Sequence, residues 1–183
     1  NTTIFRKKGT EEDILISTYH VDHEHLPTME IELSQGRNFS RNFPTDTAAV
    51  LLNEAAVQAF GFDAPLNEEV IYFGGEYGGT QPYRIIGVFK DFNFESLRNS
   101  IRPLALMLST EGTKLSVRMA AGDPAASVSR VEQAWNRYAP DEPFQYTFLD
   151  EDFDALFRAE QRLGQVFSVF TGLAILVACL GLM

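Results

Sequence analysis

Short apolar stretches, rich in β-branched and aromatic residues, recur along the first 150 residues between turns that contain glycine, proline and asparagine. Stretches of this length, either alternating with polar residues or continuously apolar, are typical of β-strands. The pattern predicts strands at 14–22, 31–33, 49–52, 70–73, 83–89, 104–109, 115–119 and 144–149. The residues at 34–36 are expected to form a turn that ends the second strand.

Two helices are predicted among these strands. Asn53 is a favourable N-cap for a helix at 54–60, and Gly61 is typical of the position that ends one. Asp123 is a similar N-cap for a second helix, which Pro140 would stop. The apolar face of this second helix would consist of Ala126, Val128, Val131, Trp135 and Tyr138. The sequence therefore predicts a mixed α/β domain of the α+β class.

The last part of the chain follows a different pattern. An acidic first turn after Asp150 predicts the start of a helix, and its apolar residues recur at helical spacing. We expect a stalk helix at 151–165 that continues into an uncharged run at 166–183, the start of a transmembrane helix. The residues expected to pack along the stalk and against another helix are Phe153, Leu156, Phe157, Leu163, Gly164, Ser168 and Gly172. Small residues at every fourth position allow a second helix to approach closely.

Composition narrows the classes of function. The chain carries a formal net charge of −10, which repels phosphate backbones and disfavours nucleic-acid binding. A single cysteine, Cys179, allows no disulfide within the chain. No catalytic set of Ser/His/Asp or Cys/His residues can be argued, so an extracytoplasmic hydrolase is the least favoured interpretation.

The order of the predicted elements indicates two interleaved subdomains. Strand, helix and strand follow one another at 110–150, whereas short strands, glycines and prolines dominate 41–109. We expect the segment 41–109 to be a mainly β subdomain inserted into one made from 1–40 and 110–150.

Four stretches, at 21–40, 49–62, 83–108 and 148–183, resemble successive parts of one family. The third carries the motif IIGVFKDF, and the first ends in GRNF. In this order they are similar to permease subunits of ABC transporters that have a MacB-like periplasmic core domain and an FtsX-like permease domain, in the form found in Bacteroidetes-type bacteria. The resemblance implies a porter-like βαβ subdomain at 1–40 and 110–150, without its N-terminal part, and an inserted Sabre-like subdomain at 41–109.

The resemblance also implies a function. The chain would be a non-enzymatic periplasmic domain of an inner-membrane permease, without cofactor, that couples cytoplasmic ATP hydrolysis to periplasmic movement or export. Its implied partners are an ABC-type ATPase subunit, a second permease copy, the membrane through the C-terminal helix, and a periplasmic adaptor, peptide or lipoprotein. No P-loop motif of an ATPase occurs in the sequence. The alternative is an extracellular peptide-binding sensor module of a membrane complex.

Two groups of residues are candidates for binding. A segment of polar and aromatic side chains after a strand would either contact a partner protein or close the inserted subdomain, and consists of Lys90, Asp91, Phe92, Asn93 and Phe94. Three histidines, His20, His23 and His25, offer ligands for zinc or copper. On a strand His20 would point away from the other two, so we favour a polar loop and predict no metal site.

Overall fold

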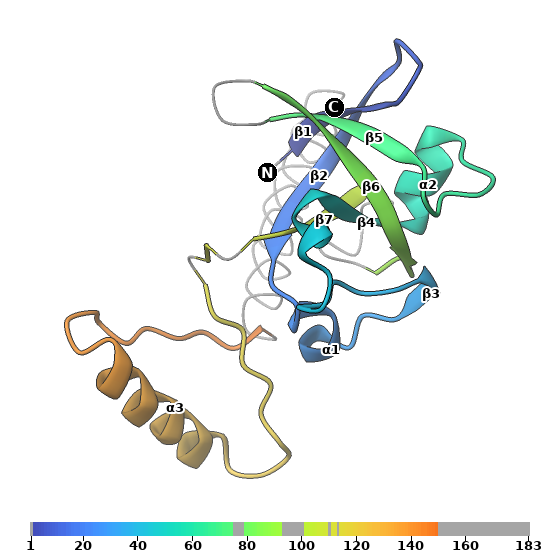
Figure 1. Cartoon of the computed structure of the whole chain (residues 1–183). Helices are drawn as coiled ribbons and strands as arrows, with labels where there is room; N and C mark the ends of the chain where they lie inside the picture. The colour runs from blue at the N-terminus through green and yellow to red at the C-terminus, as the bar shows by residue number, and fades with distance from the viewer. Residues whose placement is uncertain (1, 75–78, 93–100, 110, 113, 150–183) are drawn as a thin grey trace, which may run out of the picture. The chain divides into compact units, whose positions relative to one another are not determined.

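The computed structural model describes residues 2–74, 79–92, 101–109, 111–112 and 114–149 (Figure 1). These residues belong to two compact units, Asn1–Ala120 and Ala121–Met183. In the first unit the elements are β1 (Thr2–Lys7), β2 (Asp13–Val21), α1 (His25–Met29), β3 (Leu33–Gly36), η1 (Pro44–Ala48), β4 (Ala49–Asn53), α2 (Glu54–Phe60), β5 (Glu69–Phe73), β6 (Thr80–Phe89) and β7 (Leu104–Leu108). The second unit contains α3 (Pro124–Tyr138).

The strands of the first unit form one seven-stranded mixed sheet in the order β3-β6-β4-β7-β2-β1-β5. The sheet closes on itself, because β5 pairs with β1 at one edge and with β6 at the other. The long strand β6, green in Figure 1, makes this closure: Thr80–Arg84 pair with β5, and its second half pairs with β4 and β3. The ring of pairings therefore joins strands that lie far apart in the sequence.

Both faces of the central strands are buried, and their alternating side chains enter two different cores. In β4, Val50 and Leu52 enter one core, and Ala49 and Leu51 enter the other. The first core also contains Phe5, Ile16, Val70, Tyr72, Ile85, Ala105 and Met107, with Ala56, Phe60 and Phe62 from α2 and the residues after it. The second also contains Val21, Leu26, Phe39, Phe89, Leu104 and Leu106. Burial on two faces explains why β4 and β7 are continuous apolar runs.

The side chain of Asn53 connects four parts of the first unit. It is 1% exposed and uses its full hydrogen-bonding capacity. Its Oδ1 accepts from the backbone N–H of Ala56 at 3.0 Å, which caps α2, and from that of Leu104 at 2.8 Å. Its Nδ2 donates to Asp91 Oδ1 at 2.8 Å and to the Arg102 carbonyl oxygen at 3.0 Å. Asn53 therefore fixes the ends of β4, α2, β7 and the segment after β6.

Most of the predicted elements are confirmed with small shifts of their ends. The helix at 54–60 begins and ends as predicted, with Asn53 as N-cap and Gly61 in the left-handed conformation that ends it. The second helix begins at Pro124 after the Asp123 cap and ends at Tyr138, before Pro140. The mixed α/β class is confirmed as well.

Three elements were not predicted from the sequence: strand β1, helix α1 and the 3-10 helix η1. Strand β1 escaped notice because its second half, Arg6 and Lys7, is polar, although Phe5 is completely buried between β2 and β5. The short helix α1 lies where a polar loop was expected, and Leu26 anchors it in the second core. The prediction of a strand at 31–33 followed by a turn at 34–36 is wrong, since β3 comprises Leu33–Gly36 along β6 and residues 31–32 form no strand.

The predicted strands at 115–119 and 144–149 are also wrong. Residues 114–120 and 143–148 form no helix or strand, and Leu149 is helical. Leu115 and Val117 are exposed, at 72% and 50%. Alternation specifies two faces of an extended segment but does not supply the neighbouring strand that a sheet requires. Within the described residues, the segment 114–120 is instead held by Arg118, which donates to the Thr28 carbonyl oxygen and pairs with Glu30 at 2.6 Å.

The described part of the second unit contains α3 and, after it, a segment rich in aromatic side chains. Trp135 donates its indole N–H to the Glu142 carbonyl oxygen at 3.0 Å, and its ring lies 6.2 Å from that of Phe144. The ring of Tyr146 lies 5.6 Å from the rings of both Phe144 and Phe148. No residue of α3 is fully buried, although the predicted apolar face contributes Trp135 to this aromatic row.

The predicted division into subdomains remains a prediction. Strands from 1–40 and from 41–109 join the same sheet, and the chain divides into its two compact units after Ala120. The stalk at 151–165 and the apolar run at 166–183 lie outside the described residues. Among the residues described, no helix has the length and apolar character required to cross a membrane.

Replacing Asn53 by alanine should destabilise the first unit strongly. Asn53→Ala removes the cap of α2 and leaves the buried Leu104 N–H without its acceptor, so the free energy of unfolding should fall by about 2 to 4 kcal/mol. Urea denaturation followed by circular dichroism measures the loss, and hydrogen exchange of the β7 amides locates it.

The matched control is Asp123→Ala, which removes the exposed N-cap of α3 and should cost only about 1 kcal/mol. Equal losses in the two variants would show that Asn53 acts as a helix cap and nothing more.

Candidate binding site

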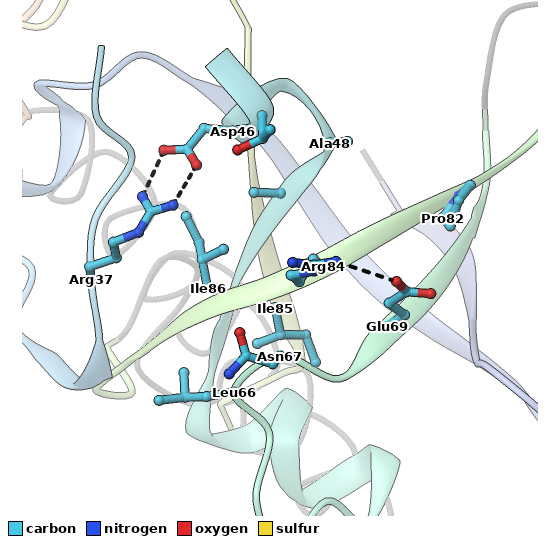
Figure 2. Close-up of a pocket in the computed structure, with 12 residues that line it drawn as sticks. Arg37, Asp46, Ala48, Leu66, Asn67, Glu69, Pro82, Arg84, Ile85 and Ile86 are labelled. Carbon is cyan, nitrogen blue, oxygen red and sulfur yellow. Dashed lines mark hydrogen bonds and ion pairs between the residues drawn. The ribbon is translucent and has the colours of Figure 1, made fainter. Parts of the chain in front are cut away.

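A cavity of about 490 Å³ opens beside one face of β6 (Figure 2). Its walls come from Arg37 and residues 45–49, from the loop at 66–69 and from residues 82–86 of β6. All of these belong to the first unit. The cavity is thus formed where the closed sheet brings three separate parts of the sequence together.

Arg37 and Asp46 form a bidentate ion pair along one wall of the cavity. The two guanidinium nitrogens of Arg37 lie 2.6 and 2.7 Å from the two carboxylate oxygens of Asp46, as Figure 2 shows. Asp46 is 1% exposed and also accepts from the Ser40 N–H at 2.9 Å. The Arg37 guanidinium lies 4.2 Å from the centre of the Phe43 ring. This geometry holds both charges in fixed positions.

The position of Arg37 follows from two paired glycines. Gly36 adopts a φ of 76° and pairs with Gly87 of β6. A Cβ atom on Gly87 would lie 2.6 Å from the Arg37 carbonyl oxygen, so only glycine permits this approach. The Arg37 N–H then donates to the Ile86 carbonyl oxygen at 3.0 Å.

The environment of Asp46 lowers its pKa. Burial acts in the opposite direction and is the largest single influence, but the hydrogen bonds from Arg37 and Ser40 and the charges of Arg37 and His23 outweigh it. The same ion pair raises the pKa of Arg37. Both groups are therefore charged at neutral pH.

The opposite wall carries a second set of charges. Lys8 Nζ lies 2.5 Å from Glu69 Oε2, and this bond lowers the pKa of Glu69. Arg84 of β6 approaches Glu69 only to 4.0 Å, and its side chain is 61% exposed. Within the described part of the chain, Glu69 therefore binds Lys8 closely and Arg84 only loosely.

The rest of the lining is mainly aliphatic, with the side-chain amide of Asn67 and the hydroxyl of Thr45. Ile85 is completely buried, and Ile86 and Leu66 present aliphatic side chains to the cavity. Asn67 adopts a φ of 70°, and its backbone N–H donates to the Ile85 carbonyl oxygen at 3.0 Å. The loop is thereby fixed to β6, so the cavity has a preformed wall. An arrangement of one loosely paired cation beside aliphatic groups can bind an anionic ligand.

The predicted partner segment turns out to be partly structural. Lys90 Nζ pairs with Glu32 Oε2 at 2.5 Å, and Asp91 accepts from Asn53 and from the Ala55 N–H. The Phe92 ring lies 6.0 Å from that of Phe89 and packs on the second core. The contacts of Asp91 hold the segment against the C-terminal end of β4 and the N-terminal end of α2. A role of this segment in binding a partner protein stays a prediction.

The other candidates are placed only in part. Asn93 and Phe94 lie outside the described residues, as do the stalk and helix-packing candidates Phe153, Leu156, Phe157, Leu163, Gly164, Ser168 and Gly172. His20 lies in β2, whereas His25 begins α1, where partial burial lowers its pKa. Among the residues that the structure describes, no three His, Cys, Asp or Glu side chains lie close enough together to hold a metal ion.

Sequence reasoning missed the cavity altogether. Its charged residues, Arg37, Asp46, Glu69 and Arg84, follow no motif and are separated by strands and loops of different length. The one local signal was the motif at 36–39, whose glycine and arginine are the pair that places the ion pair with Asp46.

Residues 2–138 match the family model described as the MacB-like periplasmic core domain. The resemblance seen in the sequence is thereby confirmed. A search among curated proteins finds no match.

Two solved structures share the fold. The periplasmic region of MacB from Actinobacillus actinomycetemcomitans is 16% identical with a TM-score of 0.54, and the match covers 75% of this chain and 63% of that one. A domain described as part of a permease protein from Porphyromonas gingivalis is also 16% identical with a TM-score of 0.54, with coverage of 84% and 78%. The extracellular domain of the noncanonic ABC-type transporter YknZ from Gram-positive bacteria is 21% identical, with a TM-score of 0.44 and coverage of 59% and 50%.

The Arg37–Asp46 pair should make the stability of the first unit depend on pH. Because the folded-state pKa of Asp46 is lowered, its contribution is complete above the unfolded-state pKa, near 4, and is lost as the pH falls through the folded-state value. Asp46→Asn should lower the free energy of unfolding by about 2 to 3 kcal/mol at pH 7. Urea denaturation of both proteins at pH 7 and pH 3 measures the difference.

The difference between the two proteins should shrink at pH 3, which lies below the unfolded-state pKa, because the unfolded state then binds a proton that the folded state resists. Asp63→Asn changes an exposed carboxylate outside the cavity and is the control. A constant difference across this range would contradict the assignment.

Proposed function

Since the chain belongs to the family of MacB-like periplasmic core domains, we propose that it is the extracytoplasmic domain of an ABC transporter permease in the inner membrane. The family match over residues 2–138 is the observation that carries this proposal. The shared fold of the two permease domains with TM-scores of 0.54 supports it. The chain spans 63% of the MacB periplasmic region, so its activity within a whole transporter belongs to the proposal.

The proposed role is mechanical and non-enzymatic. The closed ring of strands, with a core on each face, supports movement of the first unit as one body rather than as separate strands. A displacement of the expected stalk at 151–165 would then move this body without deforming it. Rigid elements with two packing arrangements transmit such changes.

The proposed partners follow from the same role. An ABC-type ATPase subunit on the cytoplasmic side would supply the energy, and a second copy of the permease would complete a symmetric dimer. A periplasmic adaptor, peptide or lipoprotein would be the partner or cargo of the extracytoplasmic body.

A second function, recognition of an extracellular ligand, is favoured by the cavity on β6. A preformed apolar hollow with a few convergent polar groups is the usual form of a ligand site. In that case the domain would act as a peptide-binding sensor, and ligand would stimulate ATP hydrolysis in the assembled complex. A transporter whose ATPase rate is independent of every peptide tested would argue for the mechanical role alone.

The mechanical role predicts a specific defect when small residues of the expected stalk and transmembrane helix are enlarged. Gly164→Leu and Gly172→Leu would each separate the packed helices and should reduce transport and its coupling to ATP hydrolysis at least several-fold. The measurements are ATPase rate and transport in the intact complex in membranes. Circular dichroism of the 183-residue chain should be unchanged.

The matched control is Ala174→Leu, two residues beyond Gly172 and therefore on another face of the expected helix. Transport and ATPase rates that stay at the wild-type level in both glycine variants would refute the packing role.

A further inference from the structure

Arg84 is the least engaged of the charged groups that line the cavity. Its only ion pair within the described residues is the 4.0 Å approach to Glu69, which is too long for a hydrogen bond. A guanidinium group carries five N–H donors in a planar fork. Arg84 therefore presents a cation whose directional donors are not used by the described part of the protein.

The neighbouring charges cannot easily turn to neutralise Arg84. Asp46 is held by both prongs of Arg37 and by the Ser40 N–H. Glu69 is bound to Lys8 at 2.5 Å. Breaking either arrangement would sacrifice a short charge-assisted hydrogen bond. Asp46 and Glu69 are therefore committed to other partners, and Arg84 is left able to bind a carboxylate that a ligand supplies.

The surroundings of Arg84 define what such a ligand must carry. Figure 2 shows Arg84 on β6 with Glu69 on one side and the Arg37–Asp46 pair on the other, while Leu66 and Ile86 supply aliphatic surface. The Asn67 side chain also lines this wall and offers an amide. An apolar group attached next to the anion would lie against the aliphatic side chains and displace water from them.

We propose that this cavity binds a peptide carboxylate that is flanked by an apolar side chain, with Arg84 holding the carboxylate in a bidentate hydrogen bond. Planar carboxylates match the guanidinium fork in geometry. The two fixed carboxylates of the walls, Asp46 and Glu69, disfavour a dianion such as phosphate, since each would repel its second charge. A carboxylate can come from the C-terminus of a peptide or from an acidic side chain, and both present the same chemistry to Arg84.

The proposal rests on the second proposed function, since it names a ligand for the same cavity, and it does not depend on the mechanical role. Binding is measured on the isolated chain, so a failed test of ATPase coupling leaves it intact, and a failed binding test leaves the mechanical role intact.

The test is a titration of the purified 183-residue chain with short peptides, followed by the backbone amide signals of Arg84, Ile86 and Asn67 in NMR spectra. The first probe is N-acetyl-alanyl-leucine with a free C-terminal carboxylate, and its matched control is the same dipeptide amide. N-acetyl-aspartyl-leucine amide tests a side-chain carboxylate, and inorganic phosphate tests a general anion site. We expect one or both carboxylate probes to bind at these amides and the neutral amide and phosphate to bind at least about ten-fold more weakly.

Variants of the arginine make the test specific. Arg84→Gln should weaken the carboxylate probe about ten-fold or more, and Arg84→Lys, which keeps the charge without the planar fork, should lie between glutamine and wild type. Arg130→Gln, in α3 of the second unit, removes the same charge from outside the cavity and should leave binding unchanged. Equal binding of the acid and its amide, equal or tighter binding of phosphate, unaltered binding to Arg84→Gln, or no binding of either carboxylate probe would overturn the proposal.

Discussion

The saturation of one buried amide, that of Asn53, is the constraint on which the first unit depends. A buried side-chain amide has four hydrogen-bonding positions, and each position left empty in a core costs free energy. Here all four are filled, and the partners come from α2, the segment after β6 and the start of β7. The strand that ends in Asn53 is buried at all five positions, so a slip of one residue would exchange both of its cores at once. The amide and the register of β4 therefore support each other.

The closure of the sheet depends on a different strand. Arg84 pairs with Ala49 of β4 on one side of β6 and with Glu69 of β5 on the other, so it stands where the two halves of the ring meet. The loop at 66–68 is bonded to β6 from both directions, since Asn67 N–H donates to Ile85 and Ile85 N–H donates to Glu68. The cavity lies against this seam. Its walls are therefore set by the sheet itself.

Signals that lie close together in the sequence, such as helix caps, predicted part of the fold. The rest depends on contacts between residues that are far apart in the sequence. The helix at 54–60 was readable because its cap and its terminating glycine are adjacent in the sequence and act on their own helix. The strands at 115–119 and 144–149 were predicted from alternation alone, and alternation does not identify a partner strand. Strand β1 was missed for the opposite reason, because Phe5 is buried by strands that the local sequence does not reveal. The family resemblance indicated the fold, but the cavity combines residues whose proximity only the closed sheet creates.

A fold shared at 16% identity does not identify a ligand, because one fold carries many functions and each depends on the residues of its own site. The arrangement of charged side chains in this chain indicates which ligand its cavity would bind. In a chain with a net charge of −10, several described cations of the first unit are held close to acidic groups, as in Arg6 with Asp13 and Lys90 with Glu32. Among the charged residues that line the cavity, Arg84 differs because its acidic neighbour, Glu69, binds Lys8 more closely. A carboxylate held there would contact β6 while its apolar neighbour lay against the loop before β5, so the ligand would bridge the two strands that close the sheet. Binding would then stabilise the closed ring by an amount that reflects the affinity of the ligand for that state alone.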